Sequence, residues 1–345
     1  MVILNFNWNY FWEDVRDFVS EHKGLIFGAV MFVILIPVFI FIFKIFSAAD
    51  ESYEEPKREH GQALTTNPKL QRNMGILLLG LDKENGGAQR ADSIIVVMYN
   101  AKENKAETIR IPRDLYVEMD DYKGKINGLY EKKGVDGMMS MVSEYIGIPI
   151  THFVKTDFDG LTNIIDNIGG IELDSEIEIN NSNNKQVGKD IHVNKGHVEL
   201  DGKEALAYSR IRYIDNDIKR GERQQQVIKA IAHKLTQPEN LPNLANNLEG
   251  ISPYVKSNIK ISDVTSRMSS VSNQPDMEKL DFKWDSFDYK KQSYVKISRK
   301  ERDRISEELR SFVGLNPITL KPIVTDPTDQ NEVDEVRSEL SINEY

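Results

Sequence analysis

The chain has 345 residues, a net charge of -10 and no cysteine. This length leaves room for about two domains, or one large domain with extensions. The lack of cysteine excludes a disulfide framework and a thiolate zinc site, and the six histidines show no ligand-like spacing that would indicate a histidine metal site. The acidic balance and the lack of a helix-turn-helix pattern argue against a nucleic-acid-binding protein.

An uncharged apolar segment, Leu25–Phe43, lies near the N-terminus. Its 19 residues would span roughly 28 Å as a helix, which is enough for the hydrocarbon core of a bilayer. A signal peptide is the alternative, but its apolar region is usually shorter. The sequence therefore predicts a transmembrane helix over residues 25–46, after a short cytoplasmic or interfacial tail over residues 1–24. The flanking charges do not decide the orientation.

Polar segments lie on both sides of the part of the chain that has a globular pattern. Residues 47–72 contain two prolines and no apolar period, so they are predicted to be a linker. Residues 316–345 are acidic and are predicted to be a disordered tail. The segment between them, residues 73–315, is predicted to fold as one domain.

Strand and helix patterns alternate within this domain. Short apolar runs predict strands at Gly75–Leu81, Ser93–Tyr99, Glu107–Ile111, Phe153–Thr156, Ile171–Leu173 and Tyr294–Ile297. Apolar residues at helical spacing predict helices at Val135–Ile146, Gly160–Ile168, Lys203–Tyr208, Gly221–Leu235 and Arg302–Phe312. This alternation predicts a three-layer α/β/α domain with a central mixed sheet, preceded by one N-terminal transmembrane helix.

Two carboxylates lie at the ends of neighbouring predicted strands. Asp82 follows the first strand, and Asp92 precedes the second. Ligands of α/β sheets bind at strand ends, and Mg²⁺ favours one or two carboxylates together with substrate phosphate oxygens. The alternative is structural, with Asp92 capping a turn and Asp82 paired with Arg90.

Two further charged segments follow along the chain. Arg113 and Asp114 come after the third strand and a proline, where they would form either a loop ion pair or another phosphate-binding group. Lys125 precedes Asn127, and lysine serves as a point charge for phosphate, although a single lysine indicates little. If the sheet forms as predicted, these segments and the two carboxylates converge.

The segment Tyr208–Gln226 is rich in arginine against the acidic background of the chain. Its basic side chains are Arg210, Arg212, Lys219, Arg220 and Arg223. Guanidinium groups present forked donors that match phosphate oxygens, so the cluster favours a site for a phosphate-rich ligand. On this segment alone, a solvated ion-pair network with Asp215 and Asp217 is an equally good interpretation.

Together and in this order, these segments resemble the LytR-CpsA-Psr family of membrane-anchored bacterial cell-wall ligases. The resemblance covers about Asn73–Leu315 and rests on LLLGLD, QRADS, IPRDLYV, KINGLY, THFVKTDFDGLTNIIDNIGGIEL, DGKEALAYSRIRY and DNDIKRGERQQQV. It implies that residues 73–315 form an extracellular catalytic domain on a single-pass anchor in the cell membrane. It also implies an α/β/α fold with a long hydrophobic tunnel for a lipid.

The resemblance implies a phosphotransferase. Members of the family move a glycopolymer, such as a teichoic acid or a capsular or secondary wall polysaccharide, from an undecaprenyl-pyrophosphate carrier to peptidoglycan. The C6 hydroxyl of N-acetylmuramic acid is the acceptor, and undecaprenyl phosphate leaves. The implied partners are the carrier-linked glycopolymer, peptidoglycan and the lipid membrane, with no nucleic acid.

Motif positions carry the family's site residues onto this sequence. By this resemblance Asp82 and Asp92 hold Mg²⁺, with Mn²⁺ as the alternative metal. The residues that match pyrophosphate-binding positions, or lie in the same motifs, are Arg90, Arg113, Arg210, Arg212, Arg220, Arg223 and Gln224. The catalytic candidates are Arg113 and a carboxylate base, for which the sequence does not choose between Asp92 and Asp114.

Two other classes of function stay open on the sequence. The same arginines and aspartates would serve a membrane protein that binds polyprenyl phosphates or hydrolyses pyrophosphate without ligase activity. A regulatory protein of the LytR attenuator type is the second alternative. The net charge of -10 and the predicted anchor argue against its binding DNA directly.

Overall fold

The computed structural model describes residues 51–55, 73–83, 89–180, 191–211, 217–237, 240, 244–260 and 276–342. The predicted membrane span at Leu25–Phe43 lies outside these ranges. Among the helices within them, none combines the length and the apolar character needed to cross a bilayer. Part of the predicted linker, residues 51–55, contacts the folded domain, because the Glu54 amide donates to the Ser257 carbonyl at 2.8 Å.

A six-stranded mixed sheet forms the centre of the fold, in the order β10-β3-β2-β1-β6-β9. Its strands are β1 (Met74–Lys83), β2 (Gln89–Asn100), β3 (Lys105–Arg110), β6 (His152–Asp157), β9 (Lys256–Ser257) and β10 (Asp276–Leu280). β2 is antiparallel to both β1 and β3, and β6 is parallel to β1. Consequently β1, β3 and β6 end at the same edge of the sheet, where β2 begins.

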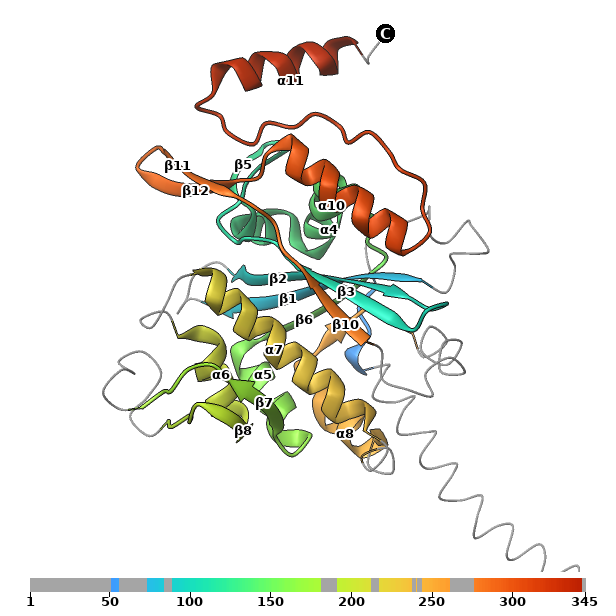
Figure 1. Ribbon diagram of the computed structural model, residues 1–345, viewed down its shortest axis with the longest axis vertical. Helices are drawn as coiled ribbons and strands as arrows, with labels where there is room; N and C mark the ends of the chain where they lie inside the picture. Colours follow the sequence, from blue (N-terminus) through green and yellow to red (C-terminus); the bar gives the residue numbers. More distant parts are fainter. Residues whose placement is uncertain are drawn as a thin grey trace, which may run out of the picture.

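Helices cover both faces of this sheet (Figure 1). One face carries α4 (Ile126–Ile146) and α10 (Arg299–Phe312), and the other carries α5 (Phe158–Asn167), α6 (Gly202–Arg210), α7 (Asp217–Thr236) and α8 (Leu244–Ile251), followed by the short helix η2 (Ser252–Tyr254). Three two-stranded hairpins complete the fold: β4 (Tyr116–Met119) with β5 (Tyr122–Lys125), β7 (Ile171–Ser175) with β8 (Gly196–Leu200), and β11 (Asp285–Tyr289) with β12 (Gln292–Lys296). The predicted α/β fold with a central mixed sheet is confirmed.

The side chains of β1 alternate between two environments. Leu77, Leu79 and Leu81 are buried in a hydrophobic cluster between the sheet, α4 and α10. A second cluster lies within the other layer, among α5, α6, α7 and the β7–β8 hairpin. Ile76 and Leu78, on the opposite face of β1, belong to neither cluster and are only half-buried. The sheet face toward α5 and α7 is therefore incompletely packed at Ile76 and Leu78, although Ile95, the cross-strand partner of Leu78, is buried.

Helix α6 approaches α5 through a glycine. Asp201 caps α6, and it forms a reciprocal capping box with Glu204. The next residue, Gly202, donates its amide to Asp166 Oδ1 at 2.7 Å. A Cβ atom on Gly202 would lie 2.2 Å from the carbonyl oxygen of Thr162, so any larger residue would push the two helices apart. This contact explains the glycine of the DGKEALAYSRIRY segment.

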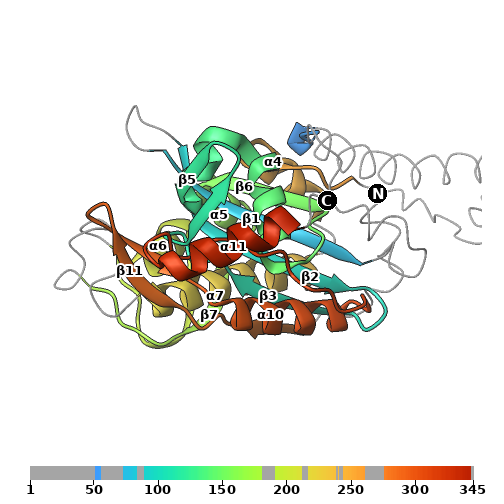
Figure 2. The ribbon, with the colours of Figure 1, turned by 90° about the horizontal axis from the view of Figure 1, so that it is seen from above.

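The prediction of a disordered tail over residues 316–345 was wrong for its described part, residues 316–342. This part contains helix α11 (Gln330–Ile342), on which Val333 and Val336 are buried. Figure 2 shows α11 crossing above the layer that contains α4 and α10.

Two ion pairs connect this acidic segment to the rest of the domain. Lys296 Nζ of β12 lies 2.7 Å from Asp326 Oδ2, and Arg299 Nη1 of α10 lies 3.0 Å from Glu339 Oε1. An acidic segment of this kind would remain solvated in isolation. Here its carboxylates pair with basic side chains on elements that are distant in sequence.

Glu107 on β3 provides a stability prediction. Burial, followed by the nearby carboxylates Glu308 and Glu278, raises the pKa of Glu107 from 4.5 to about 7, and its Oε2 atom has no hydrogen-bond partner among the described residues. Because the pKa in the folded state is above that of the unfolded chain, the stability present below pH 4.5 is lost as the pH rises through 7.

We therefore expect Glu107→Gln to raise the melting temperature at about pH 8 and to change it little at about pH 5. Thermal unfolding of the full chain at both pH values would measure this. Glu103→Gln, at an exposed position close to β3, is the control. Equal shifts in the two variants would contradict the assignment.

Candidate functional site

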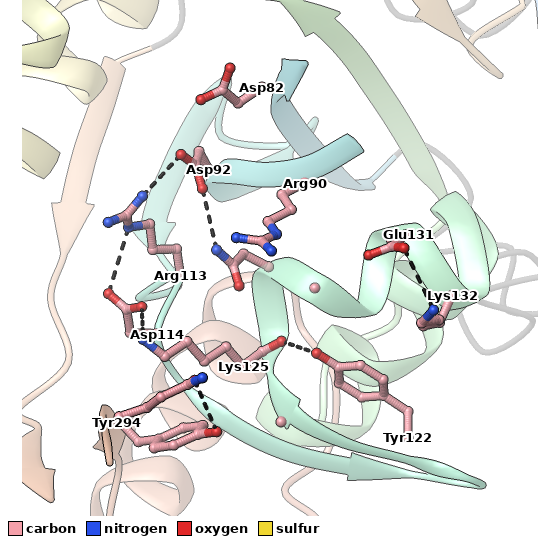
Figure 3. A pocket seen from close by; sticks show the side chains of 14 residues that line it. Asp82, Arg90, Asp92, Arg113, Asp114, Tyr122, Lys125, Glu131, Lys132 and Tyr294 are labelled. Atoms are coloured by element: carbon pink, nitrogen blue, oxygen red, sulfur yellow. Dashed lines mark hydrogen bonds and ion pairs between the residues drawn. The ribbon is translucent and has the colours of Figure 1, made fainter. Parts of the chain in front are cut away.

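The charged segments meet at the sheet edge where β1 and β3 end and β2 begins. They surround a cavity of about 430 Å³. Its charged lining residues are Asp82, Arg90, Asp92, Arg113, Asp114, Lys125, Glu131 and Lys132 (Figure 3). All four segments that the sequence predicts to converge at the strand ends contribute to this lining.

A β-bulge directs Asp92 into the cavity. Gly80 pairs with Ser93 and Leu81 pairs with Ala91, so Asp92 has no partner residue on β1. Bulges re-aim side chains and are common beside active sites.

The contacts of Asp92 tie the start of β2 to two other elements. Asp92 Oδ2 accepts a hydrogen bond from Arg113 Nη1 at 2.9 Å, and Oδ1 accepts one from Asn127 Nδ2 at 3.3 Å. Arg113 lies in the loop after β3, and Asn127 lies in the first turn of α4. Asp92 therefore links three elements at the cavity and does not act as the turn cap considered for it.

Asp82 reaches the same cavity from the end of β1. It is the cross-strand neighbour of Arg90, but its carboxylate has no hydrogen-bond or ion-pair partner among the described residues, so the alternative of an Asp82–Arg90 pair is not observed. Because side chains alternate along a strand, Asp82 continues the face of β1 that carries Ile76 and Leu78. The half-buried apolar row thus leads to a carboxylate that is open to a ligand.

Arg113 lies between two carboxylates, and its side chain is 20% exposed. Its Nη1 atom bonds Asp92, whereas its Nε atom lies 3.6 Å from Asp114 Oδ2, which is too long for a hydrogen bond. The Nε atom is buried and has no acceptor among the described residues. Buried donors normally have a partner, and an anionic ligand in the cavity would supply one.

Lys125 is part of the cavity lining, although a single lysine indicated little in the sequence. Its Nζ atom lies 2.7 Å from Asp114 Oδ1 and 5.4 Å from the centroid of the Tyr294 ring. Tyr294 belongs to β12, and its neighbour Val295 donates its amide to the Asp114 carbonyl at 2.9 Å. The β11–β12 hairpin therefore forms a wall of the cavity, which no local sequence pattern signalled.

Tyr122 is another lining residue that the sequence analysis missed. Burial raises its pKa to about 12, so its hydroxyl stays neutral, and it donates a hydrogen bond to the carbonyl oxygen of Lys125. A Cβ atom on Gly128 would lie 2.7 Å from the Tyr122 hydroxyl. The glycine in the KINGLY segment was the one local signal that another group approaches the backbone there.

Two of the predicted phosphate-binding arginines on α7 are buried. Arg223 donates from Nε to the Tyr208 carbonyl at 2.9 Å and from Nη2 to the Ile211 carbonyl at 2.7 Å. These bonds satisfy carbonyl groups at the C-terminal end of α6, which gives Arg223 a structural contact. Arg220 is 3% exposed.

Two other residues of the arginine-rich segment, Arg210 and Gln224, contact elements near the same edge of the sheet. Arg210 is exposed, with its guanidinium carbon 4.1 Å from the centroid of the Phe158 ring, just after β6. Gln224 Oε1 accepts a hydrogen bond from Ser93 Oγ of β2 at 3.2 Å. Arg212 lies outside the described residues. The described cavity lining contains no residue of α6 or α7, so the phosphate-binding roles of these side chains stay predictions.

The LytR_cpsA_psr family matches residues 39–311 of the chain. Bacillus subtilis TagV, a polyisoprenyl-teichoic acid–peptidoglycan teichoic acid transferase, is 32% identical over 232 residues, which are 64% of this chain and 59% of TagV. The chain thus spans less than two thirds of the length of TagV. Enterococcus faecalis TagU, a transferase of the same name, is 28% identical over 311 residues, which are 84% of this chain and 98% of TagU.

Solved structures have the same fold. The crystal structure of B. subtilis TagV matches with a TM-score of 0.61 and 27% identity, over 71% of this chain and 98% of that chain. The LytR-CPS2A-psr family protein YwtF (TagT), with bound octaprenyl pyrophosphate lipid, matches with a TM-score of 0.60 and 23% identity, over 75% of this chain and 98% of that chain. The family match covers more than half of the sequence. The chain belongs to the LytR-CpsA-Psr family.

Proposed function

We propose that this chain is a membrane-anchored phosphotransferase that attaches a glycopolymer, such as a teichoic acid, to peptidoglycan on the outer side of the cell membrane. The donor is the polymer on an undecaprenyl-pyrophosphate carrier, and the acceptor is the C6 hydroxyl of N-acetylmuramic acid. The observation that carries the proposal is the continuity of one face of β1, which runs from an apolar row to the charged cavity. The transferase names of the relatives and the lipid bound to TagT support it.

The apolar row provides a place for the prenyl chain. Ile76 and Leu78 of β1 and Val97 of β2 are half-buried on the sheet face toward α5 and α7, outside both hydrophobic clusters. Burying apolar surface contributes about 25 cal/mol of favourable free energy per Å². A hydrocarbon chain in this layer would bury the apolar surface of these side chains that the protein's own packing leaves exposed. At the end of the row, Asp82 and Arg90 line the cavity that would hold the pyrophosphate.

The charge of the cavity supports a metal-assisted pyrophosphate site. The lining has four carboxylates and four basic side chains, so the formal charges cancel and a pyrophosphate would bring an excess of negative charge. Asp82, which has no partner among the described residues, and Asp92 would provide the hard oxygen ligands that suit Mg²⁺, or Mn²⁺ as the alternative. When bound, such an ion would neutralise charge on the phosphate oxygens.

The remaining side chains would divide the chemistry between them. Arg113 would bind the phosphoryl oxygens with its fork of donors, including the buried Nε atom. Asp114, which faces Lys125 and Tyr294, would accept the proton of the sugar hydroxyl. The hydroxyl oxygen would bond to phosphorus, the bond from phosphorus to the bridging oxygen would break, and the lipid phosphate would leave with that electron pair.

The experiment uses the full chain in detergent with a lipid-pyrophosphate-linked saccharide, Mg²⁺ and peptidoglycan oligomers. Mass spectrometry should detect the saccharide joined to muramic acid through phosphate. Free saccharide phosphate without this adduct would instead identify a pyrophosphate hydrolase. Lipid binding without turnover would identify a carrier-binding or regulatory protein.

Asp82→Asn tests the metal assignment. We expect the Mg²⁺ concentration for half-maximal transfer to rise by about 10-fold or more, because even residues that only support metal ligands have effects of that size. Transfer rates measured over a Mg²⁺ series would show the shift. Asp121→Asn is the control, since Asp121 is fully exposed and pairs with Lys133 outside the cavity lining. A wild-type Mg²⁺ response in Asp82→Asn would count against the assignment.

A further inference from the structure

The cavity has two chemically different ends (Figure 3). The ionic end contains Asp82, Arg90 and Asp92, close to the strand ends. The aromatic end contains the rings of Tyr122 and Tyr294. Gln292, two residues before Tyr294 on β12, is an exposed residue of the same lining. Phosphate chemistry accounts for the ionic end but gives no reason for two tyrosines and a glutamine.

The rings of the aromatic end are held rigidly. The Tyr294 ring stacks on Phe287 with centroids 5.6 Å apart, and it meets Tyr116 edge-on at 5.6 Å. Tyr122 is held by its hydrogen bond to the Lys125 carbonyl, and its hydroxyl occupies the space that a side chain at position 128 would fill. Rigid aromatic side chains offer a large apolar surface with a polar tip at a low entropic cost.

These groups match the chemistry of a sugar ring. The C–H faces of a pyranose pack against aromatic surfaces, and its hydroxyl groups need both donors and acceptors. The Gln292 amide and the Tyr294 hydroxyl supply both, with Gln292 Oε1 3.5 Å from the Tyr294 hydroxyl. Glu131 and Lys132 add a carboxylate and an ammonium group to the lining.

The geometry of phosphoryl transfer indicates whether the donor saccharide or the acceptor sugar binds at the aromatic end. Attacking and leaving oxygens lie roughly in line, on opposite sides of the phosphorus. The leaving lipid phosphate belongs on the side of the apolar row, which faces α5 and α7. The aromatic end is built from β5, α4 and β12, and α4 covers the other face of the sheet (Figure 1). Asp114 and Lys125 lie between the two ends (Figure 3).

We infer that the aromatic end is the binding subsite for the acceptor sugar, a pyranose with a free primary hydroxyl, and this inference rests on the proposed function. Tyr122 and Gln292 contact the ring of that sugar. Tyr294 and Lys125 hold the wall in place beside Asp114, so that the hydroxyl enters next to the carboxylate that takes its proton.

Steady-state kinetics of the full chain in detergent test the assignment, with peptidoglycan oligomers and the lipid-linked saccharide varied separately. Gln292→Ala and Tyr122→Leu are expected to raise the KM for the oligomers by about 10-fold, the loss that 1.4 kcal/mol of binding represents. The KM for the lipid donor should not change. Ser293→Ala is the matched control, because Ser293 is exposed, adjacent on β12 and absent from the cavity lining.

Each outcome separates the subsite from the proposed function. If the wild-type chain forms no adduct, the proposed function fails and the inference fails with it. If the wild-type chain transfers and both variants keep the wild-type KM for the oligomers, the inference alone is overturned. A raised KM for the donor would assign the aromatic end to the donor saccharide and would also overturn it. Gln292→Ala decides the question if Tyr122→Leu unfolds, since Gln292 is an exposed side chain.

Discussion

Arg113→Ala is expected to lower the rate of glycopolymer transfer by about 10²- to 10³-fold, the usual effect of removing one donor that stabilises developing charge. Arg113 is the cavity arginine whose Nε donor is buried without an acceptor among the described residues, so a phosphoryl oxygen is its natural partner. The rate would be measured with the lipid-linked saccharide and peptidoglycan oligomers at saturating Mg²⁺. Arg113→Lys should recover little activity, because lysine keeps the positive charge but lacks the planar, forked set of hydrogen-bond donors of a guanidinium group.

The control for Arg113→Ala is Arg304→Ala. Arg304 lies on α10, its side chain is 43% exposed, and it pairs with Glu301 and Glu308 away from the cavity. This variant should keep the wild-type rate. Thermal unfolding of both variants would show whether the fold is retained. A wild-type rate in Arg113→Ala would refute the role given to this side chain. Arg220→Ala is a less direct test, because Arg220 is 3% exposed and its removal would also disturb the packing of α7.

Leu78→Trp is expected to raise the KM for a long-chain polyprenyl donor by about 10-fold or more, the loss that 1.4 kcal/mol of binding represents. The half-buried Leu78 side chain lies in the apolar row between the sheet and the α5–α7 layer, where an indole would occupy the space proposed for the lipid. A donor with a short, water-soluble prenyl chain should be affected far less. Transfer rates with the two donors would be compared in the same preparation.

Ile318→Trp is the matched control for this substitution. Ile318 is 49% exposed, so the added atoms of a larger side chain there can extend into solvent. The control should leave both donors unchanged. An equal effect of Leu78→Trp on the long and the short donor would contradict the lipid role of the row. Melting temperatures of the variants would separate loss of binding from loss of fold.

Local patterns predicted the central part of the fold well. The apolar runs of β1 and β2 appear where expected, because apolar runs bounded by turn residues determine strands locally. The convergence of Asp82, Asp92, Arg113 and Asp114 was also predictable, since each lies directly beside a strand end and the strand directions bring those ends to one edge. The apolar pattern of the strands did not predict the β-bulge at Asp92, which directs this side chain into the cavity.

Long-range packing decided the features that the sequence analysis missed. Tyr294 lies far from Asp114 in sequence, and its place in the cavity depends on the hydrogen bond between β12 and the loop after β3. In the described part of the tail, residues 316–342, acidic side chains pair with Lys296 of β12 and Arg299 of α10, and Val333 and Val336 are buried. Arg223, which the motif assigns to phosphate, bonds carbonyl groups of α6 because the α6–α7 packing buries it.

The sequence by itself determined the family, the alternation of strands and helices, and the charged residues that gather at the sheet edge. These features depend on residue order and on periodicity, which act over a few residues. Only the tertiary structure decided which of those charges share one cavity, that one wall of the cavity is aromatic, and that an incompletely packed apolar row leads to it. Such features arise from contacts between segments that are distant in the chain, whose geometry is set by the packing of the whole domain.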